Sequence, residues 1–495
     1  MAYRWRITRG SIRRCGVLWR SSAVSMEKGE LKVGDTESQL LLAFYGDDFT
    51  GSTDALEALA KSGAKTVLFL APPSAELLAA RFPDVRCVGV AGVSRSLGPE
   101  EMERELRPAF EALRELGPKV VHYKVCSTFD SSPHVGSIGK AVDIGAEAFG
   151  RQRFVPVLAG VPALGRYTLF GHHFAASIGG IYRLDRHPVM SRHPVTPMDE
   201  ADLRLHLAKQ TERSIGLLSV LDQQAGPEAM QVRLEERLRE GCGIILFDVL
   251  DDALLKRVGG LLWREAERGP LFAAGSSGVE YALAAHWIDA GLIGDSFPSP
   301  REPGPAEQLL VISGSCSPVT AGQIDHSLRQ GFALLKAPVL ELAHSDPARV
   351  QQAEERLVLQ AEEALRSGRS VVVCTSLGPD DDTIGPLREL LASRGLPASE
   401  SGRLLGAGLG RAARRLAAGC GLRRLLVAGG DTSGYIVKEL GIYALELLAP
   451  LVPGGPLCRA FAEEPALDGL ELALKGGQVG PPDYFVRVQQ GRLDR

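Results

Sequence analysis

The chain has 495 residues, of which 45% are hydrophobic and 23% are charged, and its formal net charge is −4. This length predicts two or three globular domains, and the near-neutral charge argues against a nucleic-acid-binding surface. No apolar run approaches the ~20 residues of a membrane span, so no membrane association is expected. The eight cysteines lack CxxC spacing, which argues against a zinc or dithiol site and indicates reduced thiols in a cytoplasmic protein.

The first 25 residues contain six arginines and no acidic residue. Such a composition is typical of a transit peptide, but the segment has neither an apolar core nor a helical pattern. We therefore favour a start codon assigned too early, with Met26 as the true start. In either case, residues 1–37 are expected to lie outside the fold.

The segment over residues 40–59 predicts a buried strand, a sharp turn and a helix. The turn reads GDDFTG over 46–51. Ligands bind at the carboxyl ends of strands in an open α/β sheet, and the flanking glycines would let a substrate approach the backbone. Adjacent carboxylates repel each other, so a turn that only needs a helix cap gains little from both. Asp47 and Asp48 are therefore candidate catalytic residues, although which one acts as the base stays open; the alternative is a solvated turn with one of them as N-cap.

Strands and helices alternate through the first part of the chain. Further strands are predicted over 66–70, 85–93, 119–125 and 154–158, and helices over 99–116 and 137–149. This rhythm is typical of a mainly parallel sheet covered by helices on both faces. Residues 160–200 lose the rhythm and are rich in arginine and histidine. We expect a long irregular segment there, and such segments often carry function.

Polar side chains follow several of these strands. The candidates for substrate binding are Arg95, Lys124, Ser127, Thr128 and Arg166. At one sheet edge, the cations would hold a carboxylate, the hydroxyl groups would bond a sugar, and an aspartate would take a proton from an attacking hydroxyl. The plainer alternatives are a snorkelling edge lysine and a serine/threonine turn. Because His172 and His173 are adjacent, they cannot easily face one metal ion, and no metal site is predicted.

Four prolines between residues 297 and 305 predict an interdomain linker. A second α/β rhythm follows, with strands over 309–312, 370–375 and 425–428 and helices over 318–330 and 347–368. The predicted domains are 38–296 and 307–495, joined by a linker over 297–306. The predicted fold class is thus α/β, with two domains that each hold a mainly parallel sheet flanked by helices, and an active site in the cleft between them.

Three turns rich in glycine and hydroxyl groups mark the second domain. They read SGSCS over 313–317, GGDTSG over 429–434 and KGGQVG over 475–480. Bare backbone N–H groups, hydroxyl groups and helix N-termini are the groups that bind phosphate. None of the turns matches a P-loop or the GxGxxG dinucleotide motif. Each alone could be a plain turn, but three in one domain favour a nucleotide site.

Together, the DDFTG, GSCS, GGDTSG and LKGG segments resemble the four-carbon acid sugar kinase family, over about residues 40–485. The resemblance implies an ATP-dependent kinase of short acid sugars, with the acid bound by the first domain and ATP by the second. It also implies which residues contact ATP. These are Ser315 or Ser317, Gly429, Gly430, Asp431, Thr432 and Gly477.

One segment departs from the family pattern. Members that act on 3-oxo-tetronate, threonate or erythronate resemble one another in a KxDSTLRG segment, whereas residues 124–132 read KVCSTFDSS here. Cys126 replaces the aspartate, and the Arg-Gly pair is absent. The departure implies a different acid sugar and is more similar to the 3-oxo-isoapionate kinase branch.

We therefore expect an ATP- and Mg²⁺-dependent cytoplasmic kinase that phosphorylates a hydroxyl of an acid of the 3-oxo-tetronate or 3-oxo-isoapionate type in carbohydrate metabolism. Its partners would be these small molecules, with a homodimer left open. One alternative is a nicotinamide-dependent sugar-acid oxidoreductase, against which the missing GxGxxG motif counts. The other is a non-catalytic sugar-acid-binding protein, which would need neither the aspartate pair nor a nucleotide domain.

Overall fold

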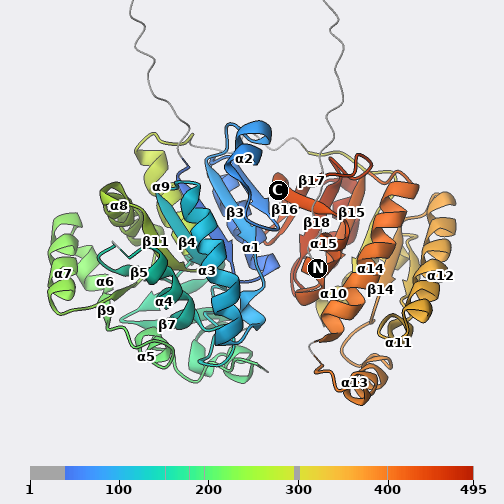
Figure 1. The fold of residues 1–495 in the computed structure, drawn as a ribbon, viewed down its shortest axis with the longest axis horizontal. Coiled ribbons are helices and arrows are strands. Elements are labelled where there is room, and N and C mark those ends of the chain that lie inside the picture. Colours follow the sequence, from blue (N-terminus) through green and yellow to red (C-terminus); the bar gives the residue numbers. More distant parts are fainter. Residues whose placement is uncertain are drawn as a thin grey trace, which may run out of the picture. The chain divides into compact units, whose positions relative to one another are not determined.

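The computed structural model describes residues 40–493 except 151, 178, 194, 295–301 and 399, and the side chain of Asp431 is likewise outside the description (Figure 1). The predicted extension over 1–37 and residues 297–301 of the predicted linker therefore fall outside the described residues. No helix within the described ranges is long and apolar enough to cross a membrane. The cysteines of the described part, seven in number, are free thiols.

The first half of the chain forms a parallel sheet. In spatial order, its strands are β2 (Thr66–Phe69), β3 (Cys87–Ala91), β1 (Leu42–Gly46), β4 (Val120–Lys124), β11 (Leu271–Gly275), β5 (Val155–Leu158), β10 (Ile244–Phe247) and β9 (Ile215–Leu218). The helices are α1 (Phe49–Lys61), α2 (Ala75–Arg81), α3 (Pro99–Glu115), α4 (Ile138–Ala148), α5 (Leu203–Ala208), α6 (Val220–Gln224), α7 (Pro227–Arg239), α8 (Asp252–Arg268) and α9 (Gly278–Asp289). Most of these strands are buried along their whole length, as expected for a sheet covered on both faces.

The second half repeats this architecture with an antiparallel addition. Its parallel strands are β13 (Ala333–Lys336), β14 (Val371–Cys374), β12 (Leu310–Ser313), β15 (Arg424–Ala428) and β18 (Glu471–Lys475), and the antiparallel pair is β17 (Gly455–Ala462) and β16 (Ile442–Val452). The helices are α10 (Pro318–Arg329), α11 (Val339–Leu342), α12 (Pro347–Arg366), α13 (Ile384–Ser393), α14 (Glu400–Gly419), α15 (Asp431–Glu439) and α16 (Tyr484–Gln490). The predicted α/β class is confirmed.

The two sets of strands are joined edge to edge. Strand β16 pairs antiparallel with β2, so that all of these strands form one 15-stranded sheet. The sequence did not predict this link, because pairing between strands almost 400 residues apart leaves no local pattern. The domain boundaries at 296 and 307 stay a prediction.

The expectation of an irregular segment over 160–200 is wrong for its first part. Residues there form a small antiparallel sheet of β6 (Arg166–Leu169), β7 (His172–Ser177) and β8 (Gly180–Arg183). Some of its buried positions are polar: Thr168 Oγ1 and His173 Nδ1 lie 2.9 Å apart, both buried. Because polar residues take interior positions, the apolar alternation that marks a strand is missing.

Candidate active site

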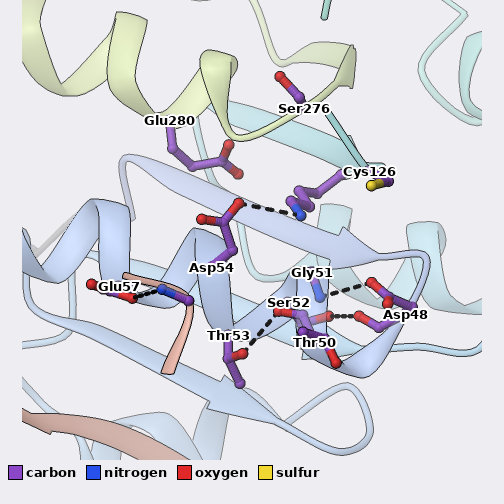
Figure 2. Close-up of polar contacts among 12 residues, drawn as sticks. Asp48, Thr50, Gly51, Ser52, Thr53, Asp54, Glu57, Cys126, Ser276 and Glu280 are labelled. Carbon is purple, nitrogen blue, oxygen red and sulfur yellow. Dashed lines mark hydrogen bonds and ion pairs between the residues drawn. The ribbon is translucent and has the colours of Figure 1, made fainter. Parts of the chain in front are cut away.

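The turn after β1 begins α1. Asp48 has an extended backbone, and its Oδ1 accepts a hydrogen bond of 2.7 Å from the N–H of Gly51 (Figure 2). Asp48 is therefore the helix N-cap, as the alternative interpretation of the turn required for one of the two acids. The apolar face of the helix, with Ala55, Leu56 and Leu59, is fully buried and holds this turn in place.

Arg95 links the two aspartates. Its Nη2 lies 2.5 Å from Asp48 Oδ2 and its Nε 3.5 Å from Asp47 Oδ2. The backbone also holds Arg95 beside Asp47, because the N–H of Arg95 donates to the carbonyl of Asp47 at 3.0 Å. Asp47 is buried, and its Oδ1 has no hydrogen-bond partner among the described residues. One carboxylate oxygen of Asp47 thus has unused hydrogen-bonding capacity.

Burial raises the pKa of Asp47 to about 7, with Arg95 acting against the rise and Asp48 adding to it. A base works best when its pKa lies near the working pH. Asp48 is bonded to the helix and to Arg95, whereas Asp47 keeps a free oxygen. The geometry therefore separates the two acids, which the sequence could not do.

Lys124 ends β4, directly beside β1. The N–H of Asp47 donates to its carbonyl at 2.8 Å, and its buried Nζ lies 3.5 Å from Asp54 Oδ2 (Figure 2). Burial opposes the charge, but the nearby carboxylates, Asp54 foremost, raise the pKa of Lys124. Lys124 is therefore a charged group within the same site.

The glycines of the turn make room for side chains of the protein. A Cβ on Gly51 would lie 2.6 Å from Lys124 Nζ and would also overlap Asp48 Oδ1, and a Cβ on Gly46 would overlap Ser52 Oγ. Packing within the protein therefore explains both glycines, and the approach of a substrate to their backbone stays a prediction.

The loop after β4 adds polar groups. Thr128 Oγ1 donates to Asp130 Oδ1 at 2.6 Å and lies 3.0 Å from Cys126 Sγ. Burial opposes ionisation of Asp130, but Arg95 and the hydrogen bond from Thr128 hold its pKa below the usual range. The carbonyl of Ser127 accepts a hydrogen bond of 2.8 Å from Nε2 of His173 in β7, so the small sheet supports this loop.

Arg166 supports its own hairpin, and in the described part of the chain Arg95, not Arg166, pairs with the two aspartates. Its Nη1 donates to the carbonyl of Leu164 at 2.9 Å and to that of Ala176 at 3.3 Å. Its buried Nε has no partner in the part of the chain that is described. The role of Arg166 in substrate binding stays a prediction.

In the second half, the first and third glycine turns pack together. Ser317 Oγ caps α10 by accepting from the N–H of Val319 at 3.2 Å, and Ser315 Oγ accepts from the N–H of Ser317 at 3.2 Å. A Cβ on Gly477 would lie 2.7 Å from Ser315 Oγ. Glycine at this position is therefore what allows the two turns to meet.

The second turn surrounds Thr432. Gly429 has a φ of 152°, and a Cβ on Gly429 or on Gly314 would overlap Thr432 Oγ1. Within the described residues, this buried hydroxyl has no hydrogen-bond partner. Gly430 has a φ of −77° and open space around it, so Gly429 is the residue that conformation restricts to glycine. Asp431 begins α15, and its side chain is not described.

The aspartate turn and the glycine turns meet at the first turn of α1. A Cβ on Gly476 would lie 3.4 Å from Thr50 Cγ2, and a Cβ on Gly434 would lie 3.7 Å from Phe49 Cδ2. Two helical turns further on, Glu57 Oε2 accepts a hydrogen bond of 3.2 Å from the N–H of Gly454 (Figure 2). The turn that carries Asp47 and Asp48 and two of the glycine turns therefore lie next to each other.

Sequence reasoning missed three charged residues in this region. They are Asp54, Asp130 and Lys475. Asp130 and Lys475 both lie in segments that the motifs already covered, but no pattern showed that they are buried. Lys475 is 1% exposed and is the last residue of the buried strand β18.

Two domain models and several known proteins match the chain. Residues 42–283 match the model of a sugar-binding N-terminal domain, and residues 310–485 match that of a nucleotide-binding C-terminal domain. The chain is 48% identical over 457 residues to a 3-oxo-isoapionate kinase of Paraburkholderia graminis, covering 92% of this chain and 95% of the relative. It is 32% identical over 448 residues to a 3-oxo-tetronate kinase of Pseudomonas savastanoi pv. phaseolicola, covering 90% and 96%.

Solved structures share the fold. A crystal structure from Salmonella typhimurium LT2 superimposes with a TM-score of 0.73 at 26% identity, covering 91% of this chain and 99% of that one. A Haemophilus influenzae protein superimposes with a TM-score of 0.65 at 24% identity, covering 90% of this chain and 99% of that one. At this identity, it supports the fold alone. Fold and site define the class as a phosphotransferase with separate sugar and nucleotide domains. The chain belongs to the four-carbon acid sugar kinase family.

Proposed function

We propose that the chain transfers the γ-phosphoryl group of ATP to a hydroxyl of a short acid sugar, with an acid of the 3-oxo-isoapionate type as the first candidate. The observation that carries the proposal is the meeting of a buried aspartate, which has a free oxygen, with the glycine turns at the first turn of α1. The identity of 48% to the 3-oxo-isoapionate kinase, against 32% to a 3-oxo-tetronate kinase, supports the acid type. The departure at Cys126 supports it further.

In this proposal, Asp47 is the base. The substrate hydroxyl donates to Asp47 Oδ1, which takes its proton as the hydroxyl oxygen attacks the γ-phosphorus. The new P–O bond forms as the bond between the γ-phosphorus and the β,γ-bridging oxygen breaks, and that oxygen leaves with ADP. Arg95 keeps Asp47 oriented and favours its ionised form. Lys124 and the hydroxyl groups of Ser127 and Thr128 bind the other oxygens of the acid.

The nucleotide would be held mainly by backbone and hydroxyl groups. Ser315, Ser317 and Thr432 offer hydroxyl groups, and the N-termini of α10 and α15 offer N–H groups and the positive ends of their dipoles. The free Thr432 hydroxyl fits a phosphate oxygen. Mg²⁺ neutralises phosphate charge when it is bound. Since the described residues contain no group of three or more metal-ligating side chains, phosphates and water would be its main ligands.

The test is an assay of ADP release with ATP, Mg²⁺ and a panel of 3-oxo-isoapionate, 3-oxo-tetronate, D-threonate and D-erythronate. We expect turnover with at least one acid and the highest kcat/KM with 3-oxo-isoapionate. Absence of ADP release with every acid would overturn the kinase proposal, whereas a preference for 3-oxo-tetronate would overturn the acid type alone. Thermal unfolding with ATP or NAD adds a check, because a ligand stabilises the fold that binds it. A shift with NAD alone would favour the oxidoreductase alternative.

A cytoplasmic location suits a reaction that consumes ATP and remains part of this proposal. The homodimer stays a prediction, to be tested by light scattering of the purified chain.

A further inference from the structure

Lys475 stands at the junction of the three glycine turns. It is the last residue of β18, and its carbonyl accepts a hydrogen bond of 3.0 Å from the N–H of Gly429, which opens the second turn. Gly476 and Gly477 of the third turn follow directly. The backbone of Lys475 therefore connects the second and third turns.

Its side chain connects the third turn to the first. The Nζ donates to Thr320 Oγ1 and to Gln323 Oε1, both at 2.8 Å, and to the carbonyl of Gly477 at 3.4 Å. Thr320 and Gln323 belong to α10, the helix that begins at the first turn. Thr320 Oγ1 in turn donates to the carbonyl of Gly477 at 2.8 Å. One lysine thus joins all three turns.

This buried ammonium group has no acidic partner in the described ranges, since all of its hydrogen-bond acceptors are neutral. At the other end of β18, a buried cation does have an acidic partner. The guanidinium of Arg424 pairs with Glu471, the first residue of β18, and its Nε lies 2.7 Å from Glu471 Oε2. A buried charge is costly unless it is paired. Burial accordingly lowers the pKa of Lys475 to about 7.

We propose that Lys475 is a positioning residue of the nucleotide site and that the phosphates of ATP supply the counter-charge its ammonium group lacks. The inference rests on the proposed function, because it requires that the three turns bind ATP. A polyanion at these turns favours the charged lysine, and the charged lysine in turn draws the carbonyl of Gly477 and helix α10 together. Nucleotide binding and protonation of Lys475 are therefore linked.

The linkage predicts that the affinity for ATP falls as the pH rises above 7. Below pH 7, Lys475 is already charged in the free protein. Above pH 7, it is increasingly neutral when free and becomes charged when ATP binds, so binding takes up a proton and affinity falls as the pH rises. Binding of ATP makes the pKa higher than in the free protein, which sets the upper end of this window.

The neighbouring groups do not titrate in the same window. From α10, the ammonium faces the neutral side chains of Thr320 and Gln323, while Asp325 and Arg329 of that helix are exposed and pair with each other at 2.7 Å. Burial raises the pKa of Tyr484 in α16 and of Cys458 in β17, so both stay neutral. Asp47 of the acid-binding half does titrate in this window, because burial raises its pKa to about 7, so the difference in proton uptake between the wild type and Lys475→Gln reports on Lys475.

The test is calorimetric titration of the full chain with a non-hydrolysable ATP analogue and Mg²⁺ at pH 8, in two buffers of different ionisation enthalpy. We expect Lys475→Gln to take up close to one proton less than the wild type. Hydrogen bonds to a charged group predict that Lys475→Gln binds roughly 10- to 100-fold more weakly. The matched control is Lys438→Gln, which replaces an exposed lysine of α15 and should behave as the wild type.

The wild type alone also tests the inference, should Lys475→Gln fail to fold. Its affinity for the analogue should fall by up to about tenfold per pH unit above pH 7. Affinity that is flat from pH 7 to 9, or equal affinity and proton uptake in Lys475→Gln, overturns the role of Lys475 and leaves the kinase proposal intact. Absence of nucleotide binding by the wild type overturns both.

Discussion

The two halves of the site use charge in opposite ways. In the acid-binding half, the charged groups around the aspartate turn have partners of opposite charge: Arg95 lies between Asp47 and Asp48, and Lys124 lies beside Asp54. The nucleotide half is built from glycine, serine and threonine, and Lys475 has no acidic partner in the described part. A small substrate with one carboxylate has to be selected by a balanced set of charges. A polyanion such as ATP brings enough charge that backbone groups and one buried cation suffice.

The largest effect on activity is expected when the base is removed from the acid-binding half. Asp47→Asn keeps the shape of the side chain but cannot take a proton, so kcat should fall by about 10²- to 10⁴-fold with the affinity for ATP nearly unchanged. The matched variant is Asp48→Asn, whose amide oxygen still caps α1 and which should lose less activity. Steady-state kinetics and calorimetry measure both. If Asp48→Asn loses as much as Asp47→Asn, the distinction between the two acids is wrong.

Substitutions of Gly429 and Gly430 test the nucleotide half of the site. Gly429→Ala would strain a φ of 152° and overlap Thr432, so it should lower the free energy of unfolding by about 1–3 kcal/mol and also weaken ATP binding. Gly430→Ala has room in the fold and should leave stability unchanged, but its methyl group would face the phosphates and weaken binding of ATP alone. Thermal unfolding and calorimetry separate the two effects. Equal stability of the two variants would contradict this account of the turn.

The pH profile tests the base without a mutation. Asp47 has a raised pKa, so its proton-accepting form is lost as the pH falls through about 7. We expect kcat/KM for the acid to decline below that point by up to about tenfold per pH unit. The profile should be measured with saturating MgATP, so that protonation of free ATP does not contribute. A rate that is flat from pH 5.5 to 8 would exclude Asp47 as the base.

The smallest effect is expected at Thr432. Its buried hydroxyl has no partner among the described residues, so Thr432→Val should not destabilise the free protein. Loss of one hydrogen bond to a phosphate oxygen should weaken ATP binding by roughly 2- to 13-fold, the equivalent of about 0.5–1.5 kcal/mol. Unchanged binding in calorimetry would remove Thr432 from the nucleotide site.

Local patterns predicted the turns well. The apolar runs before residues 46, 313 and 429 are bounded by glycine or serine, and the structure ends β1, β12 and β15 at those points. The α/β class followed from the same rhythm. Features that depend on long-range contacts were missed: the pairing of β16 with β2, and the small sheet over 166–183, whose polar interior hides the strand pattern.

The same limit applies to the site. Sequence placed Asp47 and Asp48 together, but only burial and hydrogen-bond partners show that Asp48 caps a helix while Asp47 keeps a free oxygen. Lys475 begins the third glycine turn, yet its importance rests on the lack of a counter-charge among the described residues, which a single sequence cannot reveal. Gly46 and Gly51 were correctly noticed, but their space is taken by side chains of the protein.

The most direct test of the central claim is a crystal structure of the chain with a non-hydrolysable ATP analogue and the acid that it phosphorylates best. The account predicts the γ-phosphate at the turns around Ser315, Thr432 and Gly477, and a substrate hydroxyl within hydrogen-bond distance of Asp47 Oδ1 and in line with the γ-phosphorus. A nucleotide bound away from these turns, or an acid that does not contact Asp47, would contradict it.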